Sequence, residues 1–216
     1  MVRHPLAQGL LTLPEGLLWT VAWAGVALVG AYLLNPVCVL IFLGGALLEA
    51  VYCLLLRVSH LRTLVSGVVK TLGGVAAVFA VQPRPSPVFL AILVLWIFAW
   101  EIGGQNVPND WHDLEEDRAG EARTIPVRYG AEAAAGIILG SLVATVMLLP
   151  LLQASSPGKF SWPIQLLSLT AGIVLLILPA WRLYRTRDRS RATILFNYAS
   201  YYPLAILLLT VLSFLV

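Results

Sequence analysis

Residues 16–56 read GLLWTVAWAGVALVGAYLLNPVCVLIFLGGALLEAVYCLLL, two apolar runs that are joined by Asn35-Pro36 and carry a single charge, Glu49. A helix needs roughly 20 apolar residues to cross a hydrocarbon core of about 30 Å. Each run has about that length and lacks the alternating pattern of barrel strands, so each predicts a transmembrane helix. Because the joint is so short, we expect the two helices to form a tight antiparallel hairpin.

The same pattern continues to the end of the chain. After the runs at 16–34 and 36–56, five more follow at 63–81, 88–104, 131–152, 162–181 and 200–216. Of the 216 residues, 59% are hydrophobic and 12% are charged, against roughly 45–50% and about 25% in soluble proteins. This composition excludes a water-soluble domain. The predicted fold class is all-α: a multi-pass transmembrane helical bundle of about seven helices, in one domain over residues 1–216.

The basic residues predict the orientation of the bundle. The net charge is only +3, but the fourteen lysines and arginines are unevenly placed. Eleven fall on the side where the first span begins: Arg3, Arg57, Arg62, Arg118, Arg123, Arg128 and the five arginines of the loop expected at 182–191. Arg84 and Lys159 fall on the other side. By the positive-inside rule the first side is cytoplasmic, which suggests the plasma membrane. Nothing in this distribution indicates nucleic-acid binding.

An acidic segment follows the fourth span on the same side. Residues 106–130 read NVPNDWHDLEEDRAGEARTIPVRYG, in which Asp110, Asp113 and Asp117 are spaced i, i+3, i+7. On one continuous helix these three carboxylates fall within an arc of roughly 60°. Asn106 shares that arc if the helix extends back past Pro108.

Three like charges on one face repel each other, so a stripe of this kind is typical of a bound cation. Carboxylates without histidine or cysteine suit a hard cation such as Mg²⁺, which also takes water and substrate phosphate as ligands. We therefore expect Asp110, Asp113 and Asp117 to bind Mg²⁺. The alternative is a solvated acidic loop, the role that we expect for Glu115 and Glu116.

The motif Asp110-x-x-Asp113-x-x-x-Asp117-Arg118 continues with Gly120, Arg123-Thr124, Pro126, Arg128 and Gly130. This pattern resembles the second aspartate-rich motif of the UbiA-type intramembrane prenyltransferases. Tyr52 with Arg57 is similar to that family's tyrosine–lysine stretch, with arginine in place of lysine. The run Arg3-His4-Pro5-Leu6-Ala7-Gln8-Gly9 resembles the residues that close the family's first aspartate-rich motif.

The resemblance implies a nine-helix fold of which this chain corresponds to helices three to nine, without the first motif and the first two helices. It implies Mg²⁺-dependent transfer of a prenyl group from an isoprenoid diphosphate to an acceptor, commonly aromatic, in the membrane, as in quinone or related lipid biosynthesis. Because one metal-binding motif is absent, we expect weak transfer by this chain alone.

The resemblance also suggests residues for the substrate. Arg57 and Arg123 are candidates for diphosphate contacts, with Tyr52 and Asn106 beside them, and Lys70 in the third span is a candidate for the chamber wall. Each basic residue has an alternative: Arg57 and Lys70 as snorkelling side chains, and Arg123 as a topology anchor. Two other functions stay open, a non-catalytic or degenerate membrane homologue or subunit, and a cation transporter.

Overall fold

The computed structural model describes residue 6 and residues 8–215, in which every regular element is a helix. In chain order these are α1 (Leu13–Leu34), α2 (Pro36–Leu54), α3 (Arg62–Val81), α4 (Pro87–Trp100), the π-helical turn η1 (Glu101–Asn106), α5 (Val107–His112), α6 (Leu114–Ala119), α7 (Ile125–Ser155), α8 (Trp162–Gly172), the π-helical turn η2 (Ile173–Ile177), α9 (Leu178–Thr186) and α10 (Arg189–Ser213). Within this part of the chain, seven helical segments are long and apolar enough to cross a membrane. The predicted all-α bundle with seven spans is confirmed.

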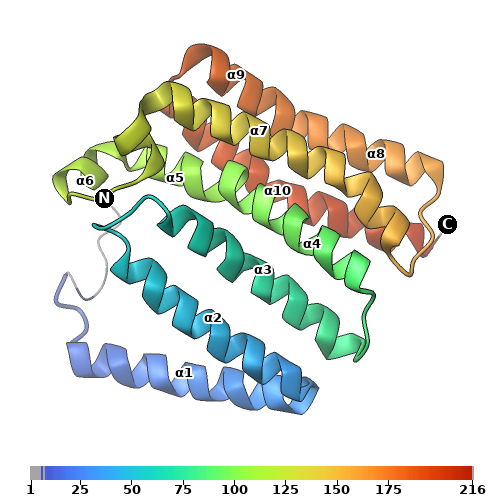
Figure 1. Cartoon of the computed structure of the whole chain (residues 1–216), viewed down its shortest axis with the longest axis horizontal. Helices are drawn as coiled ribbons and strands as arrows, with labels where there is room; N and C mark the ends of the chain where they lie inside the picture. Colours follow the sequence, from blue (N-terminus) through green and yellow to red (C-terminus); the bar gives the residue numbers. More distant parts are fainter. Residues whose placement is uncertain (1–5, 7, 216) are drawn as a thin grey trace.

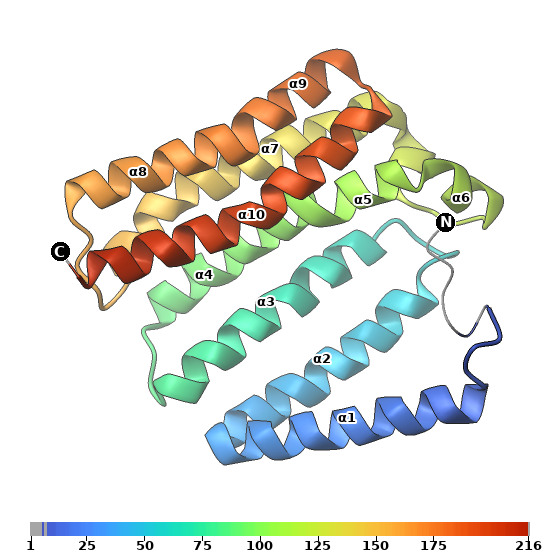
Figure 2. The ribbon, with the colours of Figure 1, turned by 180° about the vertical axis from the view of Figure 1, so that it is seen from behind.

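Successive spans run in opposite directions, as Figures 1 and 2 both show. The α2–α3 loop, the acidic segment around α6 and the α9–α10 turn lie at the end where α1 begins. The α1–α2, α3–α4 and α7–α8 connections lie at the other end with the C-terminus. The acidic segment and most of the arginines of the described residues therefore share one end of the bundle.

The tight hairpin predicted at Asn35-Pro36 is present. Asn35 ends α1 and begins α2, and its side-chain oxygen accepts a hydrogen bond from the Val37 N–H at 2.9 Å. Pro36 follows at the first helical position, where its missing N–H costs nothing. The Asn35 amide also donates to the Phe79 carbonyl at 3.0 Å, which ties the hairpin to α3.

The tightest packing lies among η1, α5, α7, α9 and α10, whose buried apolar side chains form the main core cluster. Small residues let these helices approach closely, as is common in membranes. A Cβ added at Gly103 in η1 would lie 2.9 Å from the Ile138 carbonyl oxygen of α7. The η1–α7 seam therefore has no room for a side chain at position 103.

The last span begins earlier than predicted. The sequence indicated a loop at 182–191 and a span from 200, whereas α9 runs to Thr186 and α10 starts at Arg189. Arginine is a good helix former, so its charge does not end a helix. The turn is set instead by Arg187, with φ 54°, and by Asp188, whose side chain caps α10 through the Ser190 N–H at 3.1 Å.

The fourth and fifth spans also extend beyond their apolar runs. The fourth continues through η1 and α5 to His112, and α7 begins at Ile125 before the predicted 131. Gly130 interrupts α7 with φ 79° and ψ 176°, a conformation that residues with a Cβ rarely adopt. Together these extensions draw the polar residues 101–130 against the bundle rather than leaving them in a free loop.

Candidate functional site

Polar side chains recur every fourth residue on α3. Arg62, Ser66 and Lys70 are spaced i, i+4, i+8, so they lie on one helical face. This face is turned toward η1 and the start of α5, as the contacts of Arg62 with Asp110 and of Ser66 with Glu101 show. The seam between α3 and the fourth span is therefore polar, inside a bundle whose main core is apolar.

The fourth span contributes its polar side chains through the π-helical turn η1. Glu101 begins this turn, and Gln105 and Asn106 end it, with Asn109 one turn further in α5. π-Helical turns inside α-helices are frequent at functional sites because the extra residue changes which side chains face a partner. Here the turn lets Glu101, Gln105, Asn106 and Asn109 all line one cavity.

This polar cavity has a volume of about 560 Å³ and opens between α2, α3 and the fourth span. Its lining comprises Glu49, Tyr52, Ser66, Val69, Lys70, Glu101, Gln105, Asn106, Asn109 and Phe196. Three of the residues expected from the sequence to bind substrate, namely Tyr52, Asn106 and Lys70, thus lie around the same space. Ionisable groups inside a membrane-spanning bundle are costly and commonly functional.

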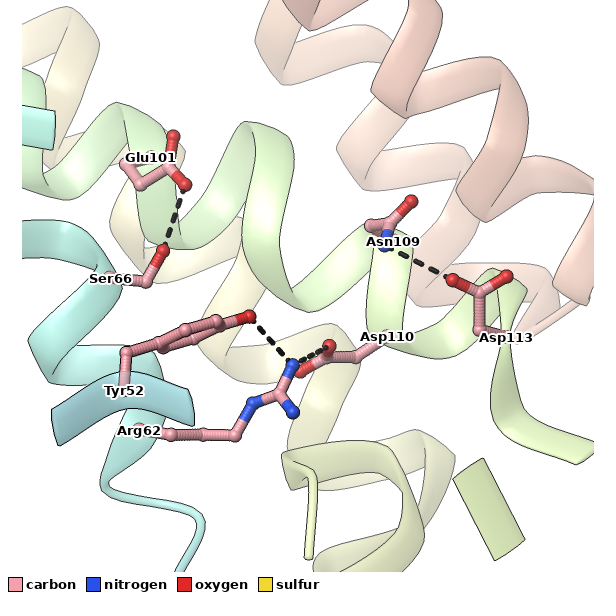
Figure 3. A network of polar contacts seen from close by, with 7 residues as sticks. All are labelled: Tyr52, Arg62, Ser66, Glu101, Asn109, Asp110 and Asp113. Carbon is pink, nitrogen blue, oxygen red and sulfur yellow. Dashed lines mark hydrogen bonds and ion pairs between the residues drawn. The ribbon is translucent and has the colours of Figure 1, made fainter. Parts of the chain in front are cut away.

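Arg62 and Asp110 form a buried ion pair at the end of the polar cavity nearest the acidic segment. The Arg62 guanidinium lies 3.3 Å from Asp110 Oδ1, and the two residues are only 7% and 4% exposed. The same Nη2 atom donates to the Tyr52 hydroxyl at 2.8 Å, and the guanidinium carbon lies 4.7 Å from the centre of the Tyr52 ring. Figure 3 shows Arg62 held between Tyr52 and Asp110. Such a pair fixes both side chains, because either charge alone would be buried without compensation.

The aspartates do not share one continuous helix as predicted. The helix breaks at Asp113, with φ −91° and ψ 14°, between α5 and α6. Asp113 accepts a hydrogen bond from the Asn109 amide at 3.1 Å and lies away from Arg62 (Figure 3). The prediction assumed one uninterrupted helix, so it missed the break at Asp113, which is accompanied by the hydrogen bond from Asn109.

Asp117 returns toward Asp110 from α6. Burial raises the pKa of the Asp117 carboxyl, and the Thr124 hydroxyl and the Arg62 charge partly offset this effect. Both Asp110 and Asp113 lie close enough to interact with it electrostatically. Glu115, by contrast, is exposed, as expected.

The donors present suit a small hard cation only in part. Among the described residues, no group of three or more His, Cys, Asp or Glu side chains is arranged to hold a metal ion. However, Asp110 Oδ2, Asp117 Oδ2 and Asn106 Oδ1 are buried oxygens without a hydrogen-bond partner. Two carboxylates with free oxygens are what Mg²⁺ commonly takes from a protein, with water and phosphate as its other ligands.

The arginines expected to contact diphosphate lie elsewhere in the structure. Arg57 is exposed and makes no hydrogen bond or ion pair with any described residue. Arg123 is also exposed; its N–H donates to the Leu56 carbonyl at 2.9 Å and its guanidinium to the Val58 carbonyl at 3.2 Å. Arg123 therefore joins the acidic segment to the α2–α3 loop, close to the site but outside the network of Asp110.

The residue that sequence reasoning missed is Arg62. It begins an apolar span, where a basic residue indicates only topology. The signal that could have identified it is the four-residue spacing with Ser66 and Lys70 on one face of that span.

An apolar groove adjoins the polar cavity. It has a volume of about 590 Å³ and runs between α1, α2 and α3, where its walls are mostly alanine and glycine, among them Ala31, Gly45 and Gly73. Glu49 and Val69 line both spaces, so the groove and the polar cavity meet at these two residues.

Comparisons with known proteins are consistent with this geometry. The family model described as "UbiA prenyltransferase family" matches residues 2–212. A digeranylgeranylglyceryl phosphate synthase from Thermococcus sibiricus is 28% identical over 160 residues, which cover 73% of this chain and 56% of that protein. The match thus spans little more than half the length of this relative. A UbiA homolog from Aeropyrum pernix K1, solved in its apo form, superposes with a TM-score of 0.69 at 21% identity, over 95% of this chain and 76% of that one.

Proposed function

The chain belongs to the UbiA prenyltransferase family, and from that premise we propose that it transfers a prenyl group from an isoprenoid diphosphate to an acceptor within the membrane. The observation that carries the proposal is the Arg62–Asp110 pair at one end of a polar cavity that opens into an apolar groove. A prenyl diphosphate has the same polarity, with an anionic head and a hydrocarbon tail.

During transfer the bond between the allylic carbon and the diphosphate oxygen breaks. Positive charge near the diphosphate oxygens stabilises the negative charge that develops on them. Arg62 would bind the diphosphate, and Arg123, which joins the acidic segment to the α2–α3 loop that carries Arg57, would add positive charge beside the site. Asp110 and Asp117, with Asp113 and Asn106 beside them, would hold Mg²⁺, which neutralises the leaving group when bound. The free oxygens of Asp110 and Asp117 support this assignment.

The hydrocarbon tail would lie in the apolar groove. The groove excludes polar groups apart from Glu49 at its junction with the polar cavity. Lipid and apolar side chains would keep water away from the tail, so the reacting end of the donor would lie at the junction of the groove with the polar cavity.

The family and one relative suggest two acceptor classes. The family commonly uses aromatic acceptors in quinone or related lipid biosynthesis, whereas the name of the Thermococcus sibiricus relative points to glyceryl phosphate lipids. We place the acidic segment on the cytoplasmic side of the plasma membrane, because the arginines gather at that end of the bundle.

Transfer assays on purified protein in vesicles test the proposal. We expect Mg²⁺-dependent transfer from radiolabelled geranylgeranyl or farnesyl diphosphate to a panel of phenolic and glyceryl phosphate acceptors. Asp110→Asn should lower the rate by roughly 10²–10³, the scale for removing one preorganised electrostatic group. The matched control is Glu115→Gln, an exposed carboxylate of the same segment, which should keep the wild-type rate. No transfer by the wild type would favour the non-catalytic or transporter alternatives, whereas full activity of Asp110→Asn would contradict the role assigned to Asp110 in the site.

A further inference from the structure

Glu101 is the most deeply buried ionisable group of the polar cavity, and the diphosphate site does not use it. It is 3% exposed, in the middle of a membrane-spanning segment. Its Oε1 atom accepts a hydrogen bond from the Ser66 hydroxyl at 3.2 Å, while its Oε2 atom has no hydrogen-bond partner (Figure 3). A buried carboxylate oxygen without a partner is costly, so a ligand that donates a hydrogen bond to it would be favoured.

The cavity around Glu101 is suited to a small polar group. Lys70 lies within electrostatic range and is a neighbouring cation on the facing helix. Asn106, which the proposed function places beside Mg²⁺, also lines this space, and Asn109 and Gln105 add amides. With Glu49 and Glu101 set against Lys70, the cavity is rich in acceptors, and a hydroxyl that donates a hydrogen bond fits it better than an anion.

Glu101 lies further into the membrane-spanning bundle than the diphosphate site, at a distance that leaves room for an acceptor hydroxyl between them. Nine residues separate it from Asp110 along one nearly continuous helix, or roughly 13 Å at 1.5 Å per residue. Tyr52 lies between the two groups, since it lines the cavity and also accepts from Arg62. The allylic carbon of a donor whose diphosphate is held at Arg62 would point into the space between Asp110 and Glu101.

We propose that the polar cavity binds the acceptor as an alcohol or phenol, whose hydroxyl donates to Glu101 and loses its proton to that carboxylate during transfer. The proposal rests on the prenyl transfer proposed above. The bond between the allylic carbon and the diphosphate oxygen breaks, and its electron pair leaves on the diphosphate. The acceptor oxygen forms the new carbon–oxygen bond, and its proton passes to Glu101. Ser66 and Lys70 position the carboxylate for this step.

The test separates acceptor chemistry from donor binding. Glu101→Gln preserves the shape and can still accept from Ser66, but cannot take a proton. We expect kcat for transfer to fall by roughly 10²-fold or more, the scale of general-base catalysis, with acceptor KM changed by less than three-fold. The affinity for farnesyl diphosphate with Mg²⁺, measured by calorimetry, should stay within about two-fold of wild type. Glu101→Asp should recover part of the rate, and Glu132→Gln, at the surface ion pair with Arg187, serves as the control.

Three results would overturn the proposal while the wild type still transfers: near-normal kcat in Glu101→Gln, a raised KM with unchanged kcat, or an equal loss of donor affinity. A wild type that transfers to no acceptor of the panel would instead refute the proposed function itself.

Discussion

The first helices of the chain bury far fewer side chains than the later ones. No residue of α1 is buried, and Cys38 is the one buried residue of α2, whereas ten residues of α7 are buried. In Figure 2, α1, α2 and α3 lie as a thin layer to one side, while α4, α7, α8, α9 and α10 surround one another. The looseness belongs to α1 and α2, which leave the apolar groove open beside α3. The inner helix of the layer, α3, packs closely on α4, where a Cβ at Gly67 would lie 2.6 Å from the Phe98 ring.

The site lies where these two regions meet, and both supply charged side chains. The tightly packed bundle supplies the carboxylates Glu101, Asp110 and Asp117, while the thin layer supplies Arg62 and Lys70 from α3 and one carboxylate, Glu49, from α2. A preorganised site needs its charges fixed before substrate arrives. The bundle gives that rigidity, and the groove of the thin layer gives room for a long chain.

The largest effect should follow from breaking the ion pair that joins the two regions. Arg62→Met leaves Asp110 buried without its partner, and we expect a loss of about 3–5 kcal/mol in the free energy of unfolding, measured by SDS titration or steric trapping. Transfer activity should be lost with it. Arg57→Met is the matched control: this arginine is exposed and unpaired, so its loss should cost less than about 0.5 kcal/mol.

The double variant Arg62→Met/Asp110→Asn sharpens this result. It removes both charges, so stability should return toward wild type while activity stays low. Equal stability of Arg62→Met and Arg57→Met would show that Arg62 does not hold the two regions together.

Next in size is the glycine seam within the bundle. Gly103→Ala places a Cβ 2.9 Å from the Ile138 carbonyl oxygen, which is backbone and cannot rotate away. Overpacking of this kind costs typically about 1–3 kcal/mol, and the melting temperature in detergent should fall accordingly. Gly136→Ala is the control: Gly136 lies on α7, the helix that Gly103 packs against, but faces open space, so the melting temperature should change little. If the two variants have the same melting temperature, the η1–α7 seam is looser than its geometry indicates.

The features that the sequence could predict are those that depend on local properties of the chain. The seven spans, the Asn35-Pro36 hairpin and the fold class follow from apolar length, because lipid imposes internal hydrogen bonding on any chain that crosses it. The resemblance around Asp110 and Asp117 predicted a metal site there, since motif spacing is a local property; the structure gives both residues buried oxygens without partners, and the metal site itself stays a prediction. Tyr52, Asn106 and Lys70 were also singled out from the sequence and lie around one cavity.

What the sequence could not predict depends on contacts between distant segments. Arg62 becomes part of the site only because α3 packs on η1, 48 residues from Asp110 in the chain. The π-helical turn and the break at Asp113 shift the faces that a regular helix would present. The sequence prediction treated the arginines of 182–191 as a loop. The helix α10 nevertheless starts at Arg189, because the side chain of Asp188 caps its first turn.

A smaller effect, on specificity rather than stability, should come from filling the groove. Gly73 lines the groove and has nothing within 4 Å of a Cβ built there, so the side chain of Gly73→Phe can start into the groove and would occupy part of it. If the tail lies there, kcat/KM for geranylgeranyl diphosphate should fall about ten-fold relative to geranyl diphosphate, the scale of a pocket that lacks room for part of a chain. Gly44→Phe, equally open but outside the groove, should leave the ratio unchanged. An unchanged ratio in Gly73→Phe would place the tail elsewhere.

The smallest effect should be found at the outer face of the thin layer. Trp19 and Trp23 stack one turn apart on α1, with ring centres 6.4 Å apart, and both are exposed. Lipid replaces the lost contacts of an outward-facing side chain, because acyl chains are as apolar as leucine. Trp23→Leu should therefore change the free energy of unfolding by less than about 0.5 kcal/mol in lipid vesicles, and leave transfer intact. The measurement in vesicles is the decisive one, since detergent would not reproduce the lipid contacts. A loss as large as that of Gly103→Ala would mean that the outer face of α1 is covered by protein rather than lipid, and would remove the basis for treating α1–α3 as the thin side of the molecule.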